Sequence, residues 1–346
     1  MKVGLFDHIG RADTNLAKLF DERLAFYGAA DRLGFYCFHL AEHHCSPVNM
    51  APSPSVFLAA LARETKTMRM GPLCYLLTLY SPLRILEEIS MLDHLSHGRF
   101  EIGVGRGVSP YELGYHQVDH TKSREIFIDA YNCLRVGMKT DLLNYAGPYY
   151  NYKDTPVELH PFQENPAFWY GSSNATGSTW AGEQGMHFTA NGPTNVAKAN
   201  IATFKEALAK RGGPEVSKPE FSGGVAIGAL RQVVVAETDE EALAIAGPAC
   251  LKHLEELNWL RTKHANSEHA ERLNFPRAAT VEGMRKAGTL IAGSPKTVIE
   301  EIRRQTEELG TNYLLNYMMF GNMTLKQSMA SINLFHAAVM PEVERM

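Results

Sequence analysis

Three short polar segments of this 346-residue chain contain residue types that can do chemistry, and each follows a run typical of a strand. The first segment, residues 41–45, reads Ala-Glu-His-His-Cys. Histidine exchanges protons near neutral pH, which makes this pair a candidate for general acid–base catalysis, the alternative being a packed polar residue. The same residue types bind metals, but adjacent histidines point in opposite directions and no i, i+4 partner follows. We therefore predict acid–base chemistry here and no metal site.

The second segment, residues 103–107, reads Gly-Val-Gly-Arg-Gly. It is a weak dinucleotide fingerprint, because it lacks the third glycine of that pattern and no helix opens directly behind it. An arginine between glycines suits a phosphate better, since glycine allows close backbone approach and the guanidinium supplies a charged fork. The alternative is a tight strand exit with Arg106 in solvent.

The third segment, residues 171–178, reads Gly-Ser-Ser-Asn-Ala-Thr-Gly-Ser and leads into a predicted helix. Small hydroxyl and amide side chains can cap the free N–H groups of a helix start, and the same geometry binds phosphate. Taken by itself, this segment is equally consistent with helix capping alone and with phosphate binding. Together with Arg106, it favours a phosphate site.

Strand-like and helix-like runs alternate along the chain and must position these segments. Predicted strands cover residues 2–6, 36–41, 68–77, 100–104, 168–171, 186–190, 225–236 and 312–318. Predicted helices cover residues 16–33, 55–65, 82–95, 123–138, 176–184, 194–211, 294–308 and 325–339, and another begins at 239–246. Strands separated by helices pair in parallel, and eight such units favour an α/β fold of the closed (β/α)8 TIM barrel type over an open sheet.

Two stretches fall outside this repeat. Residues 142–166 are rich in Tyr and Pro, and residues 248–291 are charged and weakly periodic. We interpret both as insertions into a single barrel domain spanning residues 1–346, and the second is long enough to form a lid over the active-site face. Because chemistry in such barrels lies on the loops after the strands, the three polar segments should share one mouth.

The composition excludes several classes of protein and of binding partner. The hydrophobic fraction of 45% and the charged fraction of 21% exclude a disordered or fibrous chain. A net charge of −4 gives no reason to expect a nucleic acid or an anionic membrane as partner. The sequence has neither a membrane-spanning apolar run nor the apolar stretch of a signal peptide at its start. Its five cysteines form no CxxC pair, so we expect a cytoplasmic protein.

Six stretches together resemble the bacterial luciferase-like flavin-dependent monooxygenase family, and are most similar to its luciferase α subunit branch. In chain order they are MKVGLF at the start, LAEHH at 40–44, MGPLCYLLTLYSPLRILEEISMLDHLSHGRF at 70–100, GRG at 105–107, SSNATGSTWAGEQG at 172–185 and SMASINLFHAAVMP at 328–341. The resemblance covers most of the chain and is weakest across 142–166 and 248–290.

The resemblance implies roles for individual residues. The first histidine of the family's Glu-His-His is its acid–base residue, which is His43 here. The family's Arg-Gly after strand four binds the flavin phosphate, which implies that role for Arg106. The non-proline cis peptide of the family's third strand, beneath the flavin ring, falls on Leu73–Cys74. The loop that opens the helix after strand five completes the phosphate site, here with Ser173, Asn174 and Thr176.

The chain departs from luciferase at two of these positions. The luciferase α subunit has a reactive cysteine just before the phosphate-binding arginine, where this chain has Gly105, which would enlarge or reshape the space. The luciferase loop places a glutamate where this chain has Ser173. Light emission is therefore not implied.

The resemblance implies a two-component monooxygenase that uses reduced FMN and O2 to oxygenate a small organic substrate, such as an aldehyde or ketone, through a peroxyflavin. The sequence has no fingerprint for NADH, so the reduced FMN would come from a separate flavin reductase. The family is generally dimeric, and helices 82–95 and 123–138 are more apolar than solvated helices need, so we expect a homodimer. Two alternatives are a deazaflavin-dependent oxidoreductase with the same barrel and a non-catalytic flavin-binding protein.

Overall fold

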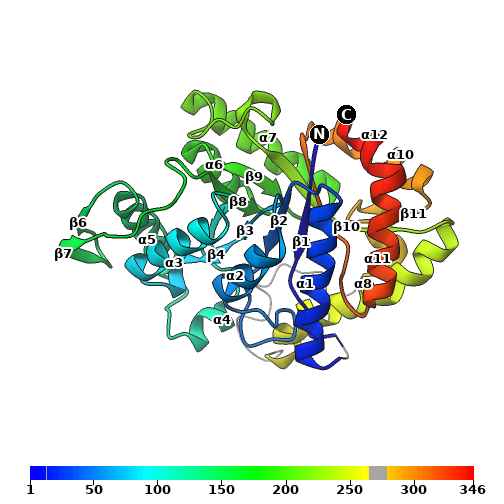
Figure 1. The fold of residues 1–346 in the computed structure, drawn as a ribbon, viewed down its shortest axis with the longest axis horizontal. Coiled ribbons are helices and arrows are strands. Elements are labelled where there is room, and N and C mark those ends of the chain that lie inside the picture. The colour runs from blue at the N-terminus through cyan, green and yellow to red at the C-terminus, as the bar shows by residue number, and fades with distance from the viewer. Residues whose placement is uncertain (13, 265–278) are drawn as a thin grey trace.

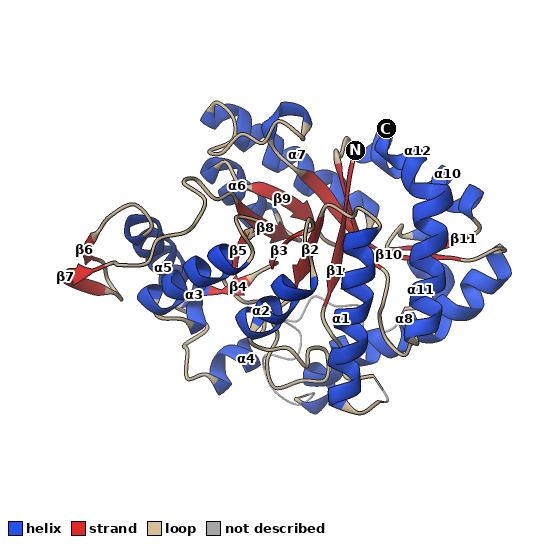
Figure 2. Ribbon diagram, in the orientation of Figure 1, coloured by secondary structure: helices blue, strands red, loops and turns tan. Residues whose placement is uncertain are grey.

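The computed structural model describes residues 1–12, 14–264 and 279–346, which form a barrel of parallel strands surrounded by helices (Figures 1 and 2). The barrel strands are β1 (Lys2–Asp7), β2 (Cys37–Leu40), β3 (Arg69–Pro72), β4 (Tyr75–Leu76), β5 (Ile102–Gly105), β8 (Phe168–Ser172), β9 (His187–Ala190), β10 (Ile227–Val235) and β12 (Tyr313–Tyr317). They hydrogen-bond in parallel in the order β3-β2-β1-β12-β10-β9-β8-β5-β4.

The short strands β3 and β4 together occupy one position in the barrel. They lie on either side of Leu73 and Cys74, and β4 pairs with β5. An isolated parallel bridge joins Met70 of β3 to Phe100, just before β5, while β3 pairs on its other side with β2. The sheet therefore closes on itself. This confirms the predicted (β/α)8 barrel, and each of the eight predicted strands has its counterpart, the one at 68–77 being split in two.

Helices cover the outside of the barrel, as Figure 2 shows. They are α1 (Leu16–Arg32), α2 (Pro54–Glu64), α3 (Pro82–Leu95), α4 (Pro110–Tyr115), α5 (Ser123–Gly137), α6 (Ala175–Gln184), α7 (Thr194–Arg211), α8 (Asp239–Lys263), α9 (Val281–Lys286), α10 (Pro295–Leu309), α11 (Leu325–Leu334) and α12 (Met340–Glu344). Among the described residues, none of these helices combines the length and apolar character needed to cross a bilayer.

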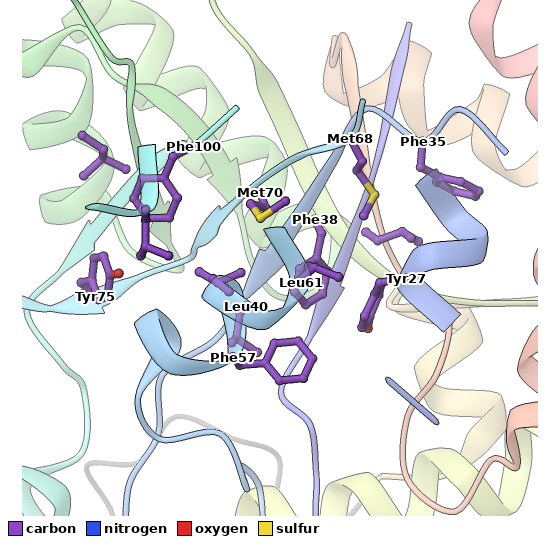
Figure 3. Close-up of a cluster of buried hydrophobic side chains, with 14 of the residues drawn as sticks. Tyr27, Phe35, Phe38, Leu40, Phe57, Leu61, Met68, Met70, Tyr75 and Phe100 are labelled. Atoms are coloured by element: carbon purple, nitrogen blue, oxygen red, sulfur yellow. The ribbon is translucent and has the colours of Figure 1, made fainter. Parts of the chain in front are cut away.

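The side-chain alternation along β2 explains how the barrel wall is built. Phe38 and Leu40 belong to the apolar cluster that fills the space between the barrel and helices α1 and α2 (Figure 3). His39, between them, points the other way, and its Nε2 lies 3.0 Å from the hydroxyl oxygen of Tyr313. Because successive strand residues face opposite sides, this register anchors the strand and leaves the residues after Leu40 at the barrel rim.

Helix α8 extends well beyond residues 239–246, where the sequence predicts that a helix begins. It continues through Pro248 to Lys263, into the predicted insertion. Proline lacks the N–H that would bond the carbonyl four residues earlier, so one helix hydrogen bond is lost. Ala246, Ala249 and Cys250 of the same helix are buried against the barrel. Tertiary packing therefore overrides the local signal of the proline.

The two predicted insertions differ in structure. Residues 142–166 contain an antiparallel hairpin, β6 (Leu142–Ala146) and β7 (Asn151–Pro156), which stands at the left edge of Figure 1. The carboxylate of Asp129 in α5 holds the hairpin by accepting hydrogen bonds from the Tyr145 hydroxyl at 2.7 Å and the Tyr149 N–H at 2.9 Å. The second insertion ends in β11 (Leu290–Gly293), a strand paired with β10 that the sequence pattern did not predict. Residues 265–278 lie outside the described residues.

Candidate active site

A cavity of about 1570 Å³ opens at the carboxyl ends of the barrel strands. Loops after several strands line it, together with the described parts of the second insertion in α8 and α9. The three polar segments therefore share one mouth, as the barrel fold predicts. All seven residues singled out from the sequence line this cavity: His43, Leu73, Cys74, Arg106, Ser173, Asn174 and Thr176.

His43 is held in the cavity wall by a carboxylate that the sequence did not suggest. Its Nδ1 lies 3.1 Å from Oε1 of Glu112, whose side chain is 5% exposed. The short helix α4 presents Glu112 after a proline, and the Ser109 hydroxyl accepts the Glu112 N–H at 3.3 Å. Burial alone would lower the pKa of His43, but the charge and hydrogen bond of Glu112 outweigh it and raise that pKa above its ordinary value. His43 is thus suited to hold a proton near neutral pH.

The neighbouring His44 contacts a different carboxylate, that of Glu42. Its Nε2 lies 2.8 Å from Oε1 of Glu42, which is buried. Glu42 also accepts the Leu76 N–H at 2.9 Å and the Tyr80 hydroxyl at 3.0 Å. Burial raises the pKa of Glu42 even though these hydrogen bonds oppose the shift. His44 and Glu42 therefore tie the end of β2 to the segment that begins with β4.

One end of the cavity carries two arginines. Arg106 and Arg124 are exposed, and neither has a carboxylate partner within the described part of the chain. The guanidinium group of Arg106 donates a long hydrogen bond of 3.4 Å to the Ser123 hydroxyl. Sequence reasoning missed Arg124, although a basic residue at the start of a helix is electrostatically unfavourable and is a signal of function.

The start of α6 lies near these arginines, because a Cβ atom on Gly177 would come 3.2 Å from the Tyr170 ring, on which the charges of Arg106 and Arg124 act. Asn174 caps this helix, because its Oδ1 accepts the Gly177 N–H at 2.9 Å. Its oxygen is thus occupied, while the backbone N–H groups of Ala175 and Thr176 have no acceptor within the helix. The side chains of Ser173 and Thr176 are exposed at the rim. Backbone N–H groups, hydroxyls and two guanidinium groups without a carboxylate partner among the described residues form a donor set that fits a phosphate.

The floor of the cavity is formed where β3 gives way to β4. The Leu73–Cys74 peptide is cis, at the position that the family resemblance implies. The sulfur of Cys74 occupies the space in front of Gly105, and a Cβ atom added to Gly105 would collide with it. The space that luciferase gives to a cysteine before its arginine is therefore filled here from the neighbouring strand.

Two further histidines line the cavity, and sequence reasoning missed both. The ring centroid of His8 lies 5.4 Å from that of His43 and 5.1 Å from that of His253 in α8. Burial and the neighbouring imidazoles lower the pKa of His8 well below its ordinary value, and lower the pKa of His253 to about 3. Both are therefore neutral at pH 7. His8 could have been found, because it directly follows the first strand, whereas a position within a helix gave no signal for His253. Within the described ranges, no group of three His, Cys, Asp or Glu side chains is arranged to hold a metal ion.

Comparison with known proteins gives consistent matches. A family model described as luciferase-like monooxygenase matches residues 1–313. The chain is 33% identical over 344 residues to the uncharacterized protein y4wF of Sinorhizobium fredii, which covers 99% of this chain and 97% of that protein. It is 25% identical over 359 residues to the oxygenase component of the flavin-dependent trigonelline monooxygenase of Acinetobacter baylyi, covering 99% of this chain and 95% of that protein. The fold is similar to the oxygenating constituent of 3,6-diketocamphane monooxygenase from Pseudomonas putida in complex with FMN, with a TM-score of 0.82, 20% identity, and coverage of 99% and 98%.

Proposed function

This chain belongs to the luciferase-like monooxygenase family, and from that premise we propose that it uses reduced FMN and O2 to oxygenate a small organic substrate. One observation carries the proposal. A single cavity has a phosphate-binding donor set at one end and the His43–Glu112 pair in its wall. The cavity volume of about 1570 Å³ leaves room for both a flavin and a substrate.

The cationic end of the cavity would hold the flavin phosphate. Arg106 and Arg124 supply charge, and the free N–H groups at the start of α6 supply directed donors. The Leu73–Cys74 segment would support the flavin ring. Reduced FMN, when bound, supplies the two electrons that activate O2.

The protein's own chemical contribution is proton management at His43. Glu112 orients the imidazole through Nδ1 and favours its protonated form. The other ring nitrogen is then left to exchange a proton with the reacting groups. The neutral side chains of His8 and His253 and the apolar side chains of Leu254 and Leu257 line the cavity together with His43. We infer a neutral substrate such as an aldehyde or ketone.

Two features of the mechanism involve other proteins. The trigonelline monooxygenase relative is by its name an oxygenase component, which supports a separate flavin reductase as the source of reduced FMN. Met91 of α3 and Val136 of α5 are large apolar residues exposed by 54% and 39%. We propose that these two helices pack against a second copy of the chain. Sedimentation at micromolar concentration should give a species of twice the 38.4 kDa chain mass.

The experiment that tests the function combines binding and turnover. Anaerobic titration of the protein with reduced FMN should show saturable binding, and mixing the complex with O2 and a panel of aldehydes, ketones and amines should give an oxygenated product. A protein that instead binds a reduced deazaflavin and transfers hydride without consuming O2 would be a deazaflavin-dependent oxidoreductase. Binding of FMN without turnover of any substrate would favour a non-catalytic flavin-binding protein.

A further inference from the structure

A buried carboxylate in α8, Glu256, borders the same small cavity as His43 and Glu112. Its residue exposure is 3%, and its Oε2 has no hydrogen-bond partner among the described residues. Its Oε1 accepts only a long hydrogen bond of 3.4 Å from the Ala12 N–H. Gly10 lies so close to this carboxylate that an added Cβ atom would collide with Oε2. The loop after β1 thus encloses the Glu256 carboxylate without supplying enough hydrogen bonds to it. Burying a carboxylate in this way costs folding free energy unless the group has another partner.

A second, small cavity joins Glu256 to the His43–Glu112 pair. It has a volume of about 10 Å³, close to that needed for one water molecule. Its polar wall consists of His43, Glu112, Glu256, Ser46 and Ser109. Two of these groups, the Ser46 hydroxyl and Oε2 of Glu256, have no hydrogen-bond partner among the described residues and would be available to a water held there.

Two histidines that line the large cavity, His253 and His8, also carry buried nitrogen atoms without hydrogen-bond partners among the described residues. The Nδ1 atom of His253 lies 4.0 Å from Oε2 of Glu256, and the centroid of the His253 ring lies 5.1 Å from that of His8. The Nδ1 atoms of both histidines lack hydrogen-bond partners within the described part of the chain. These imidazoles and the carboxylate border the same enclosed space as His43.

We propose that Glu256 is a proton-relay residue that exchanges protons with His43 through a water held in the small cavity. The relay adds a proton path to the proposed oxygenation, and its biological purpose rests on that proposed function. Glu256 acts through His43 and touches neither flavin nor substrate in this arrangement. It would connect the cavity to the outer face of α8, where Lys252 and Glu255 form an ion pair at 3.4 Å.

The charge surroundings of Glu256 suit this role. Burial raises its pKa to about 7, although the Ala12 N–H and nearby cations oppose the shift. Near neutral pH the carboxyl group is therefore divided between its protonated and ionised forms. The titratable and charged groups that face it are Lys252, His253 and Glu255 on its own helix, Arg23 on α1, Tyr317 on β12, and His43 and Glu112 across the small cavity.

The proposed reaction needs such a proton. With anionic reduced FMN, a substrate S, O2 and one proton give SO, oxidised FMN and water. The O–O bond breaks, one oxygen enters the substrate, and the other leaves as water after the flavin has given up two electrons. One proton per turnover must therefore reach the reacting groups, and Glu256 would pass it on to His43 and regain it from solvent.

The test compares Glu256→Gln with Glu255→Gln, a matched control on the same helix whose carboxylate is 70% exposed. Infrared spectra of the flavin-free protein should show a protonated-carboxyl band that titrates near neutral pH. The band should persist in Glu255→Gln and disappear in Glu256→Gln. In histidine-labelled protein, the His43 imidazole resonance, assigned with His43→Ala, should show a second inflection near pH 7 that only Glu256→Gln removes.

Turnover provides the second readout. Above neutral pH, Glu256→Gln should slow reduced-FMN-dependent oxygenation by about 10-fold, which is less than the roughly 10²- to 10⁴-fold effect of a general acid–base residue itself. FMN binding should be unchanged in this variant. Glu256→Asp, which keeps a carboxyl group, should restore most of the rate. The relay is overturned if Glu256→Gln leaves either the His43 titration or the pH profile of turnover unchanged. If the wild-type protein oxygenates nothing, the proposed function fails, while the infrared and histidine titrations still decide whether Glu256 and His43 share a proton.

Discussion

The Nδ1 atom of His43 lies 3.1 Å from Oε1 of Glu112, although 69 positions separate the two residues in the chain. The contact joins the loop after β2 to the short helix α4 after β5. It determines which ring nitrogen of His43 is occupied and leaves the other free for chemistry. The pair is largely buried, so solvent screens it little.

Glu112→Gln should shift the pH dependence of turnover. Glu112 raises the pKa of His43, so removing its charge lowers that pKa and His43 loses its proton at lower pH. A rate that requires protonated His43 should then decline at lower pH than in the wild-type protein. The measurement is the pH profile of single-turnover product yield, with Glu307→Gln on the exposed side of α10 as control. An unmoved alkaline limb would show that Glu112 does not set the protonation of His43.

Arg106→Ala should weaken binding of reduced FMN by about 1.5–3 kcal/mol, the scale of a charge-assisted hydrogen bond. Riboflavin lacks the phosphate, so its binding should change little. Arg124→Ala should act in the same direction, because both guanidinium groups line one end of the cavity. Arg304→Ala, an exposed arginine on α10 paired with Glu308, serves as control. Equal losses for FMN and riboflavin would show that Arg106 does not contact the phosphate.

His43→Ala and His44→Ala should separate catalysis from stability. His43→Ala should impair oxygenation by about 10²- to 10⁴-fold, while FMN binding changes by less than about 1 kcal/mol, since His43 is not a phosphate ligand. His44→Ala should instead lower the free energy of unfolding by about 1–3 kcal/mol, because buried Glu42 loses a charge-assisted partner. Urea unfolding and single-turnover yields on both variants provide the check. If the His43→Ala protein couples O2 consumption to product formation as well as the wild-type protein does, His43 is not the proton shuttle.

Gly105→Ala should overpack the floor of the cavity, because its new methyl group would meet the sulfur of Cys74. The expected cost is about 1–3 kcal/mol in unfolding free energy. Adding Cys74→Ala should recover most of this loss, since it removes the colliding atom. Gly114→Ala in α4 is the control, because a Cβ there meets no neighbouring atom. Additive effects of Gly105→Ala and Cys74→Ala would contradict the collision.

The sequence by itself was sufficient to predict the barrel and one mouth for its polar segments. The reason is that strand and helix periods are local properties, and parallel strands bring their carboxyl ends to the same rim. His43 and Arg106 each follow a strand within a few positions, so their placement followed from the strand assignments. The resemblance added the cis peptide at Leu73–Cys74, which the structure contains.

Only the tertiary structure decided which groups surround His43. Glu112, His8 and Glu256 come from three elements far apart in the chain, and their meeting depends on how α4 and α8 pack over the barrel. Helix α8 itself passes through Pro248, where the local signal predicts an end. Burial of its small side chains against the barrel outweighs one lost hydrogen bond, and such a balance of long-range packing against local preference has no signature in a single sequence.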